Sequence, residues 1–139
     1  MFKDLIEFPK RPKLLSPAIM AYIGDSLFEL FIRNFLLEQK VCKPNQLHKQ
    51  AINYVNATSQ AKLLEEIREE LTEKETTIVR RGRNVKTSIP QNANSKDYRY
   101  STAFEALLGY LYLSKAEERL MELFDIIKTK IIEEDHYGS

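Results

Sequence analysis

The chain has 139 residues, of which 43% are hydrophobic and 29% are charged, and this balance predicts one globular domain with a single core. The net charge at pH 7 is +1, so any contact with nucleic acid would require locally clustered charge. The single cysteine, Cys42, excludes an internal disulfide and fits a reducing compartment. Because no apolar stretch is long enough to span a bilayer and the first residues lack an apolar signal core, we expect a cytoplasmic protein without membrane contact.

The hydrophobic period is helical nearly throughout, and strand-type alternation is absent. These patterns predict an all-α fold for the single domain of residues 1–139. Residues 1–13 are expected to form an irregular arm. Ser16 and Pro17 have the form of an N-cap followed by proline at the first helical position, and the helix that they begin should end near Glu38.

The following helices are indicated by their starting signals. Pro44 should begin the second helix, and either Asn56 or Thr58 should cap the third. Thr72 and Glu75 have the spacing of a capping box, which predicts a short fourth helix that stops near the next glycine.

Residues 83–97 lose all periodicity and predict a flexible loop. Helix returns across the segment YRYSTAFEALLGYLYL. Ser114 and Glu117 then have the spacing of a second capping box, at the start of a last amphipathic helix. Between Arg80 and Arg99 the chain has six cations against one acid, so the loop is a candidate contact for a polyanion. The alternative is a solvated loop whose charge has no partner.

Two carboxylates, Asp25 and Glu105, lie in the two most hydrophobic predicted helices, and we expect both to be buried. Buried acids usually pair, neutralise or bind metal, and two converging acids suit Mg²⁺, which prefers oxygen ligands. Gly24 is costly in a helix interior and indicates close backbone packing beside Asp25. The alternative is that each acid pairs with a cation, for which Arg33 and Arg99 are candidates.

The sequence does not support other kinds of catalytic or binding site. The chain contains no G-x-S-x-G, no P-loop and no G-x-G-x-x-G motif. His48 has no Cys, Asp or second His at ligand spacing, so we interpret it as a structural or surface residue.

The motifs around the two acids resemble those of the ribonuclease III family. The segment Y-I-G-D-S-L, residues 22–27, is similar to the family signature, and F-E-A-L-L-G-Y-L-Y-L, residues 104–113, is similar to its second acidic motif. Together with L-H-K-x-A, V-N-A-x-x-Q-A and R-R-G-R-N, in this order, the chain resembles Mini-ribonuclease III over almost its whole length. The chain is too short for a double-stranded RNA-binding domain after such a catalytic domain.

The resemblance implies a helical bundle that forms a two-fold dimer and cleaves double-stranded RNA with Mg²⁺, leaving a 5′-phosphate and a 3′-hydroxyl. It implies that Asp25 and Glu105 are catalytic residues and metal ligands and that Tyr22 packs across the dimer axis. It also implies maturation of the ends of the 23S ribosomal RNA precursor, with a large-subunit ribosomal protein as auxiliary partner. The expected RNA contacts lie in the basic segment, at Arg80, Arg81, Arg83, Asn84, Lys86 and Lys96.

Two family carboxylates are missing, because Ala21 and Thr102 occupy their places. Members of the Mini-ribonuclease III family are similar in this respect, so the absence does not argue for an inactive enzyme. It does leave the number of metal ions open. The alternative function is a non-catalytic helical module that binds structured RNA, in which Asp25 and Glu105 are only structural.

Overall fold

The computed structural model describes residues 7–41, 43–85 and 88–137, and its ordered elements in this part of the chain are all helices, which confirms the predicted all-α class. None of the helices so described is both long and apolar enough to cross a membrane. In chain order the elements are the 3₁₀ helix η2 (Pro12–Leu14), α1 (Pro17–Glu38), α2 (Pro44–Val55), α3 (Ala57–Ile67), the 3₁₀ helix η3 (Arg68–Glu70), α4 (Glu73–Arg83), α5 (Ser95–Leu113) and α6 (Glu117–Tyr137).

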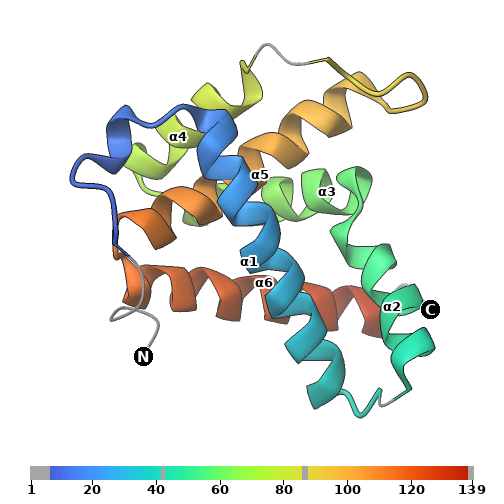
Figure 1. Ribbon diagram of the computed structural model, residues 1–139. Helices are drawn as coiled ribbons and strands as arrows, with labels where there is room; N and C mark the ends of the chain where they lie inside the picture. The colour runs from blue at the N-terminus through green and yellow to red at the C-terminus, as the bar shows by residue number, and fades with distance from the viewer. Residues whose placement is uncertain (1–6, 42, 86–87, 138–139) are drawn as a thin grey trace.

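The fold is organised around the crossing of α1 and α5, seen in Figure 1 as the blue helix in front of the orange one. A Cβ atom added to Gly24 would lie 1.7 Å from the backbone oxygen of Glu105. Reciprocally, a Cβ atom on Gly109 would lie 1.8 Å from the backbone oxygen of Met20. The two helices therefore meet backbone to backbone, which confirms the close packing that Gly24 predicts and explains why a costly helical glycine is present.

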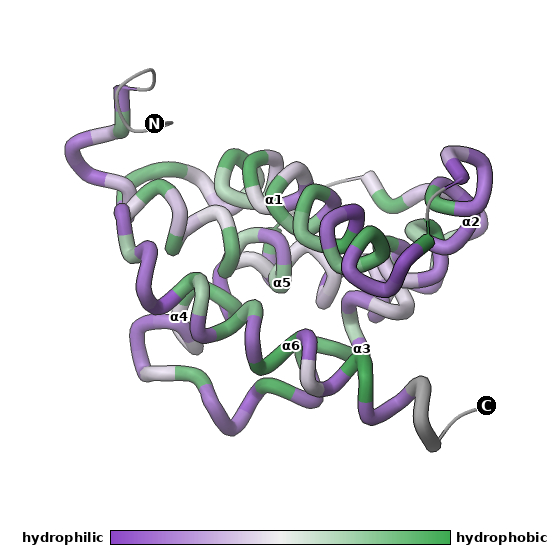
Figure 2. The backbone as a smooth tube through the Cα atoms, turned by 90° about the horizontal axis from the view of Figure 1, so that it is seen from below, coloured by the Kyte–Doolittle hydropathy of each residue, from purple (hydrophilic) through white to green (hydrophobic). Residues whose placement is uncertain are grey.

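The core forms where the remaining helices pack around this crossing, and α3 and α4 both contact α5. Its largest fully buried side chains include Phe28 and Phe104, whose rings meet edge to face with centroids 5.0 Å apart. Figure 2 shows α1 with long hydrophobic stretches, whereas α2 is largely hydrophilic. The two helices with the most buried side chains, α1 and α5, are thus the ones that carry the two candidate acids.

Helix starts follow the predicted caps. The Ser16 side chain accepts a hydrogen bond from the backbone of Ile19, and Pro17 is the first residue of α1. Asn56, rather than Thr58, caps α3, since its Oδ1 accepts from the Ser59 backbone at 2.8 Å. The capping box of α4 is also confirmed, with both reciprocal hydrogen bonds between Thr72 and Glu75 present.

Two expected boundaries are wrong. The segment between α4 and α5 is shorter than 83–97, because α4 includes Arg83 and the Asn94 side chain caps α5 by accepting from the Asp97 backbone. Ser114 does not begin α6, so the second capping box is absent. It is the C-cap of α5, and the next residue, Lys115, turns the chain with a left-handed φ of 60° before α6 starts.

A buried ion pair connects α6 to α4. Glu75 is 3% exposed, and its carboxylate accepts two hydrogen bonds of 2.9 Å from the guanidinium of Arg119 on α6. The same guanidinium donates to the Glu70 carbonyl and to the Glu122 carboxylate, both at 2.6 Å. Burial alone would raise the pKa of Glu75, but these contacts and those of the capping box hold it below its usual range. Arg119 therefore joins three segments through one side chain.

Candidate active site

The crossing of α1 and α5 brings Asp25 and Glu105 together. Asp25 follows Gly24 directly, and Gly24 lies against the backbone of Glu105. The Asp25 carboxylate is close enough to Glu105 for its charge to raise the pKa of the Glu105 carboxyl group. Two acids that are 80 positions apart in the sequence thus form one pair, as the predicted shared site requires.

The electrostatics of this pair are unfavourable without a compensating positive charge. Burial, followed by the negative charge of Asp25 and the hydrogen bond between the two carboxyl groups, raises the pKa of Glu105 to about 8. A hydrogen bond from the side chain of Gln60 on α3 acts in the opposite direction. At neutral pH the pair therefore holds a proton, and a bound cation would take the place of that proton.

The expectation that both acids are buried is wrong for Asp25, which is exposed. Glu105 is partly buried. The reason is helical geometry, since Asp25 lies one position after the buried Gly24 and at the edge of the buried face of α1. Arg33, a candidate partner for these acids, instead forms an ion pair with Glu29 at 3.3 Å. One carboxylate thus opens to solvent while the other is held against the core.

The donor set fits a hard divalent cation. Carboxylate oxygens are the ligands that Mg²⁺ prefers, and Mg²⁺ commonly keeps several waters beside one or two protein carboxylates. No group of three or more His, Cys, Asp or Glu side chains arranged to hold a metal occurs within the described residues. Asp25 and Glu105 would therefore provide the protein ligands, and water and phosphate oxygens would complete the coordination.

The residues of the basic segment have different surroundings. Arg80 is exposed at the end of α4, whereas Arg81 donates to the backbone oxygens of Lys13 and Leu15 at 3.2 and 3.3 Å. These bonds give Arg81 a structural function that the sequence pattern does not reveal. Arg83 Nε donates to the Asn84 side chain at 3.3 Å, and Asn84 is the C-cap of α4.

Two further residues of the predicted RNA contact set remain. Lys96 is exposed in the first turn of α5, with its Nζ 6.0 Å from the ring centroid of Tyr100. Lys86 lies outside the described residues, as does Cys42. His48 is exposed on α2, in agreement with its interpretation as a surface residue.

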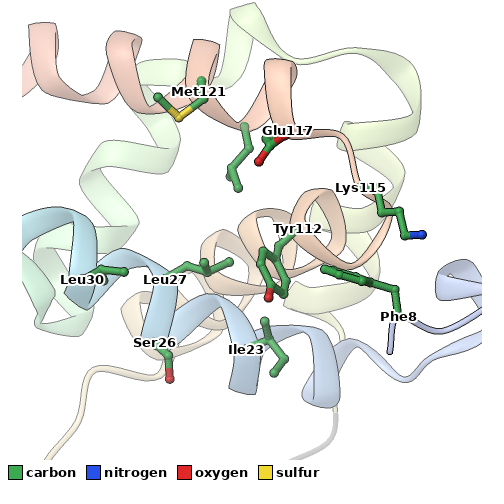
Figure 3. Close-up of a pocket in the computed structure, with 10 residues that line it drawn as sticks. Phe8, Ile23, Ser26, Leu27, Leu30, Tyr112, Lys115, Glu117 and Met121 are labelled. Carbon is green, nitrogen blue, oxygen red and sulfur yellow. The ribbon is translucent and has the colours of Figure 1, made fainter. Parts of the chain in front are cut away.

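A second feature of α1 is its exposed apolar side. Tyr22 is 78% exposed, and Leu30 and Met121 are more than half exposed. A groove of about 540 Å³ lies between α1 and the start of α6, and Figure 3 shows its apolar lining. The lining residues are Phe8, Ile23, Ser26, Leu27, Leu30, Tyr112, Lys115, Glu117, Leu120 and Met121. Such a surface is typical of an interaction site.

Gln60 is the site residue to which sequence reasoning assigns no role. It is 1% exposed on α3, and its side chain lowers the pKa of Glu105 against the effect of burial. The available signal was an amide at position 60 on the face of α3 that also carries the buried Leu63, Leu64 and Ile67. A polar side chain on such a face is expected to have a specific partner.

Comparison with known proteins agrees with this geometry. The Ribonuclease III domain family matches residues 18–116, a range that includes both acids. The Mini-ribonuclease 3 of Brevibacillus brevis is 46% identical over 118 residues, which cover 84% of this chain and 88% of that protein. The Mini-ribonuclease 3 of Symbiobacterium thermophilum is 48% identical over 113 residues, covering 81% and 87%.

A solved structure gives the same result. The crystal structure of a Fusobacterium nucleatum protein superimposes with a TM-score of 0.77 at 31% identity, covering 88% of this chain and 98% of the other. The fold, the paired acids and the relatives lead to one assignment: the chain belongs to the ribonuclease III family, among its Mini-ribonuclease 3 members, and is an endoribonuclease.

Proposed function

We propose that the chain hydrolyses double-stranded RNA with the help of Mg²⁺ held by Asp25 and Glu105. The observation that carries this proposal is the α1–α5 crossing, where Gly24 lies against the backbone of Glu105 and the adjacent Asp25 is close enough to raise the pKa of Glu105. Two acids placed together at the edge of the core are costly, and the cost is offset when a divalent cation binds between them.

The chemistry follows from the donor set. When bound, Mg²⁺ lowers the pKa of a coordinated water and neutralises charge on the attacked phosphate. Asp25, which is exposed, faces the side from which RNA can approach. Glu105, which is partly buried on α5, provides the second ligand position. The products implied by this water attack are a 5′-phosphate and a 3′-hydroxyl.

Duplex RNA is recognised by shape, phosphates and 2′-hydroxyls, because side chains cannot readily enter its deep major groove. In the proposed complex, Arg80 and Arg83 at the end of α4 and Lys96 at the start of α5 contact phosphates. Arg81 contributes less, since backbone carbonyls already occupy its guanidinium.

The working unit in this proposal is a homodimer. Support comes from the exposed apolar side of α1, where Tyr22 and Leu30 would be covered by a second copy. A symmetric pair of sites would let each subunit cut one strand of the duplex. We further propose that the substrate is the paired stem of the 23S ribosomal RNA precursor, with a large-subunit ribosomal protein as auxiliary partner, in a cytoplasmic setting.

The alternative is a non-catalytic module that binds structured RNA, and replacing Asp25 separates the two functions. Asp25→Asn should lower duplex cleavage in Mg²⁺ by at least about 100-fold while helicity and duplex binding persist, because it removes a ligand charge and little packing. Glu29→Gln, four residues further on α1, is the matched control and should cleave at the parent rate. Parent-rate cleavage by Asp25→Asn would show that the site lies elsewhere, and a parent protein that binds duplex without cutting it would favour the alternative.

A further inference from the structure

The last turn of α4 contains a glycine whose presence its own helix does not explain. Gly82 is buried, and glycine is the least favourable residue inside a helix apart from proline. Glycines near the end of a helix often adopt a left-handed φ that other residues avoid, but Gly82 does not. The reason for a glycine at this position must therefore lie in what α4 packs against.

Gly82 lies in close contact with α5. A Cβ atom added to Gly82 would lie 2.8 Å from the Cα atom of Ala103 and 3.2 Å from the Cβ atom of Ala106. Both alanines are fully buried. Because Ala106 follows Glu105 directly, the last turn of α4 lies against the part of α5 that carries a candidate metal ligand.

A second contact fixes the same turn of α4. The guanidinium of Arg81 donates to the backbone oxygens of Lys13 and Leu15, and Leu15 directly precedes the N-cap of α1. The turn is thus attached to α5 and to the segment that begins α1, the two helices that carry the candidate metal ligands. The other cations of this turn, Arg80 and Arg83, come immediately before and after the two anchoring residues.

We propose that Gly82 is a positioning residue: by letting α4 approach α5 closely, it sets the distance from Arg83 to the candidate metal site and places Arg83 on a phosphate that flanks the scissile one. This inference rests on the proposed function, because it assumes that Asp25 and Glu105 bind the cation and that the substrate is duplex RNA. Arg83 Nε donates to the Asn84 side chain at 3.3 Å, so the terminal amino groups of the guanidinium would contact the phosphate.

The competing explanation is that Gly82 only permits dense packing. Under that explanation, a side chain at position 82 would lower the stability, but a variant that still folds would bind RNA like the parent. A positioning role predicts instead that RNA binding changes, and that it changes through Arg83. The two explanations therefore differ in the salt dependence of RNA binding and in the coupling of the two residues.

The test compares Gly82→Ala with the parent and with Arg83→Ala. Loss of one phosphate contact should reduce the slope of log affinity against log salt concentration by about 1 in either variant, and the Michaelis constant for duplex RNA should rise. Mn²⁺ binding without RNA, measured by electron paramagnetic resonance, and kcat at saturating RNA and Mg²⁺ should stay unchanged. The double variant should bind RNA no more weakly than Arg83→Ala, because both substitutions remove the same contact.

Ile78→Val is the matched control for a loss of stability. Ile78 is 5% exposed and lies one turn before Gly82 on the same face of α4. Its truncation weakens the packing of this helix without adding an atom at the contact with α5. The control should therefore unfold more easily than the parent and keep the salt slope of the parent.

A parental salt slope in folded Gly82→Ala, or effects of the two substitutions that simply add, would overturn the proposal. If Gly82→Ala does not fold, the parent and Arg83→Ala are compared without metal on a duplex with a neutral methylphosphonate linkage beside the scissile position. This linkage should weaken binding by the parent but not by Arg83→Ala, and equal weakening would overturn the proposal. Cleavage by Asp25→Asn at the parent rate would refute the metal site itself, whereas a parental slope in Gly82→Ala refutes only the role of Gly82.

Discussion

The reciprocal glycine contact predicts that Gly24→Ala destabilises the protein, although alanine is the better helix former. The added Cβ would lie 1.7 Å from the Glu105 backbone oxygen, half of the 3.4 Å at which ordinary contact begins. Because the obstacle is backbone, no rotamer change can relieve the clash, and α1 must move away from α5. We take roughly 3 kcal/mol for overpacking and subtract about 1 kcal/mol for helix propensity, which leaves a net loss of about 2 kcal/mol.

The assay is urea and thermal unfolding followed by circular dichroism, with Mn²⁺ affinity measured on the same samples. A loss of about 2 kcal/mol corresponds to a melting temperature lower by roughly 8 °C in a domain of this size. Mn²⁺ binding should also weaken, since separation of the helices pulls Asp25 away from Glu105. Asn34→Ala, on the exposed side of α1, is the control and should be neutral or slightly stabilising. An equally stable or more stable Gly24→Ala protein would refute the proposed helix contact.

Three further predictions concern charge and association. The pKa of Glu105 is about 8 in the folded protein and 4.5 in the unfolded chain. In the presence of a metal chelator, the free energy of unfolding should therefore be highest below pH 4.5 and should fall as the pH rises to about 8. Glu105→Gln should remove this pH dependence of the unfolding free energy, which is on the order of 5 kcal/mol at most. A variant whose stability falls with pH as steeply as that of the parent would contradict the prediction. Tyr22→Ala should shift sedimentation at micromolar concentration toward monomer, and an unchanged dimer would place the interface elsewhere. Arg83→Ala should flatten the salt dependence of duplex binding, whereas Arg81→Ala should mainly lower the melting temperature; identical salt slopes would show that Arg83 does not contact phosphate.

The sequence predicts those parts of the fold that depend on local chemistry. The N-caps at Ser16 and Thr72 are visible in a few consecutive letters, because a cap is satisfied by residues two or three positions away. Gly24 similarly indicates close packing, because glycine destabilises a helix interior and is expected there only where another backbone approaches closely. The spacing at Ser114 was misleading, because a serine can end one helix as readily as it begins the next.

Features that depend on contacts between distant segments could not be predicted in this way. Nothing in the letters shows that Arg81 bonds to carbonyls near residue 14, since those partners are more than 60 positions away. The exposure of Asp25 depends on which positions of α1 the neighbouring helices cover, whereas its apolar flanks suggest burial. Gln60 combines both difficulties, because its effect on the pKa of Glu105 arises only when α3 packs on α5.

The buried ion pair between Glu75 and Arg119 has a consequence for the synthesis of the chain. Glu75 lies on α4 and enters the core with its negative charge, but its counter-charge is on α6, 44 positions later. Until those positions have been added, burial of Glu75 would leave its carboxylate without this partner, and an unpaired buried charge typically costs about 3–5 kcal/mol. We therefore expect the packing around Glu75 to be completed only after α6 has emerged from the exit tunnel. Nascent chains stalled before residue 119 are predicted to be more sensitive to protease than the full chain.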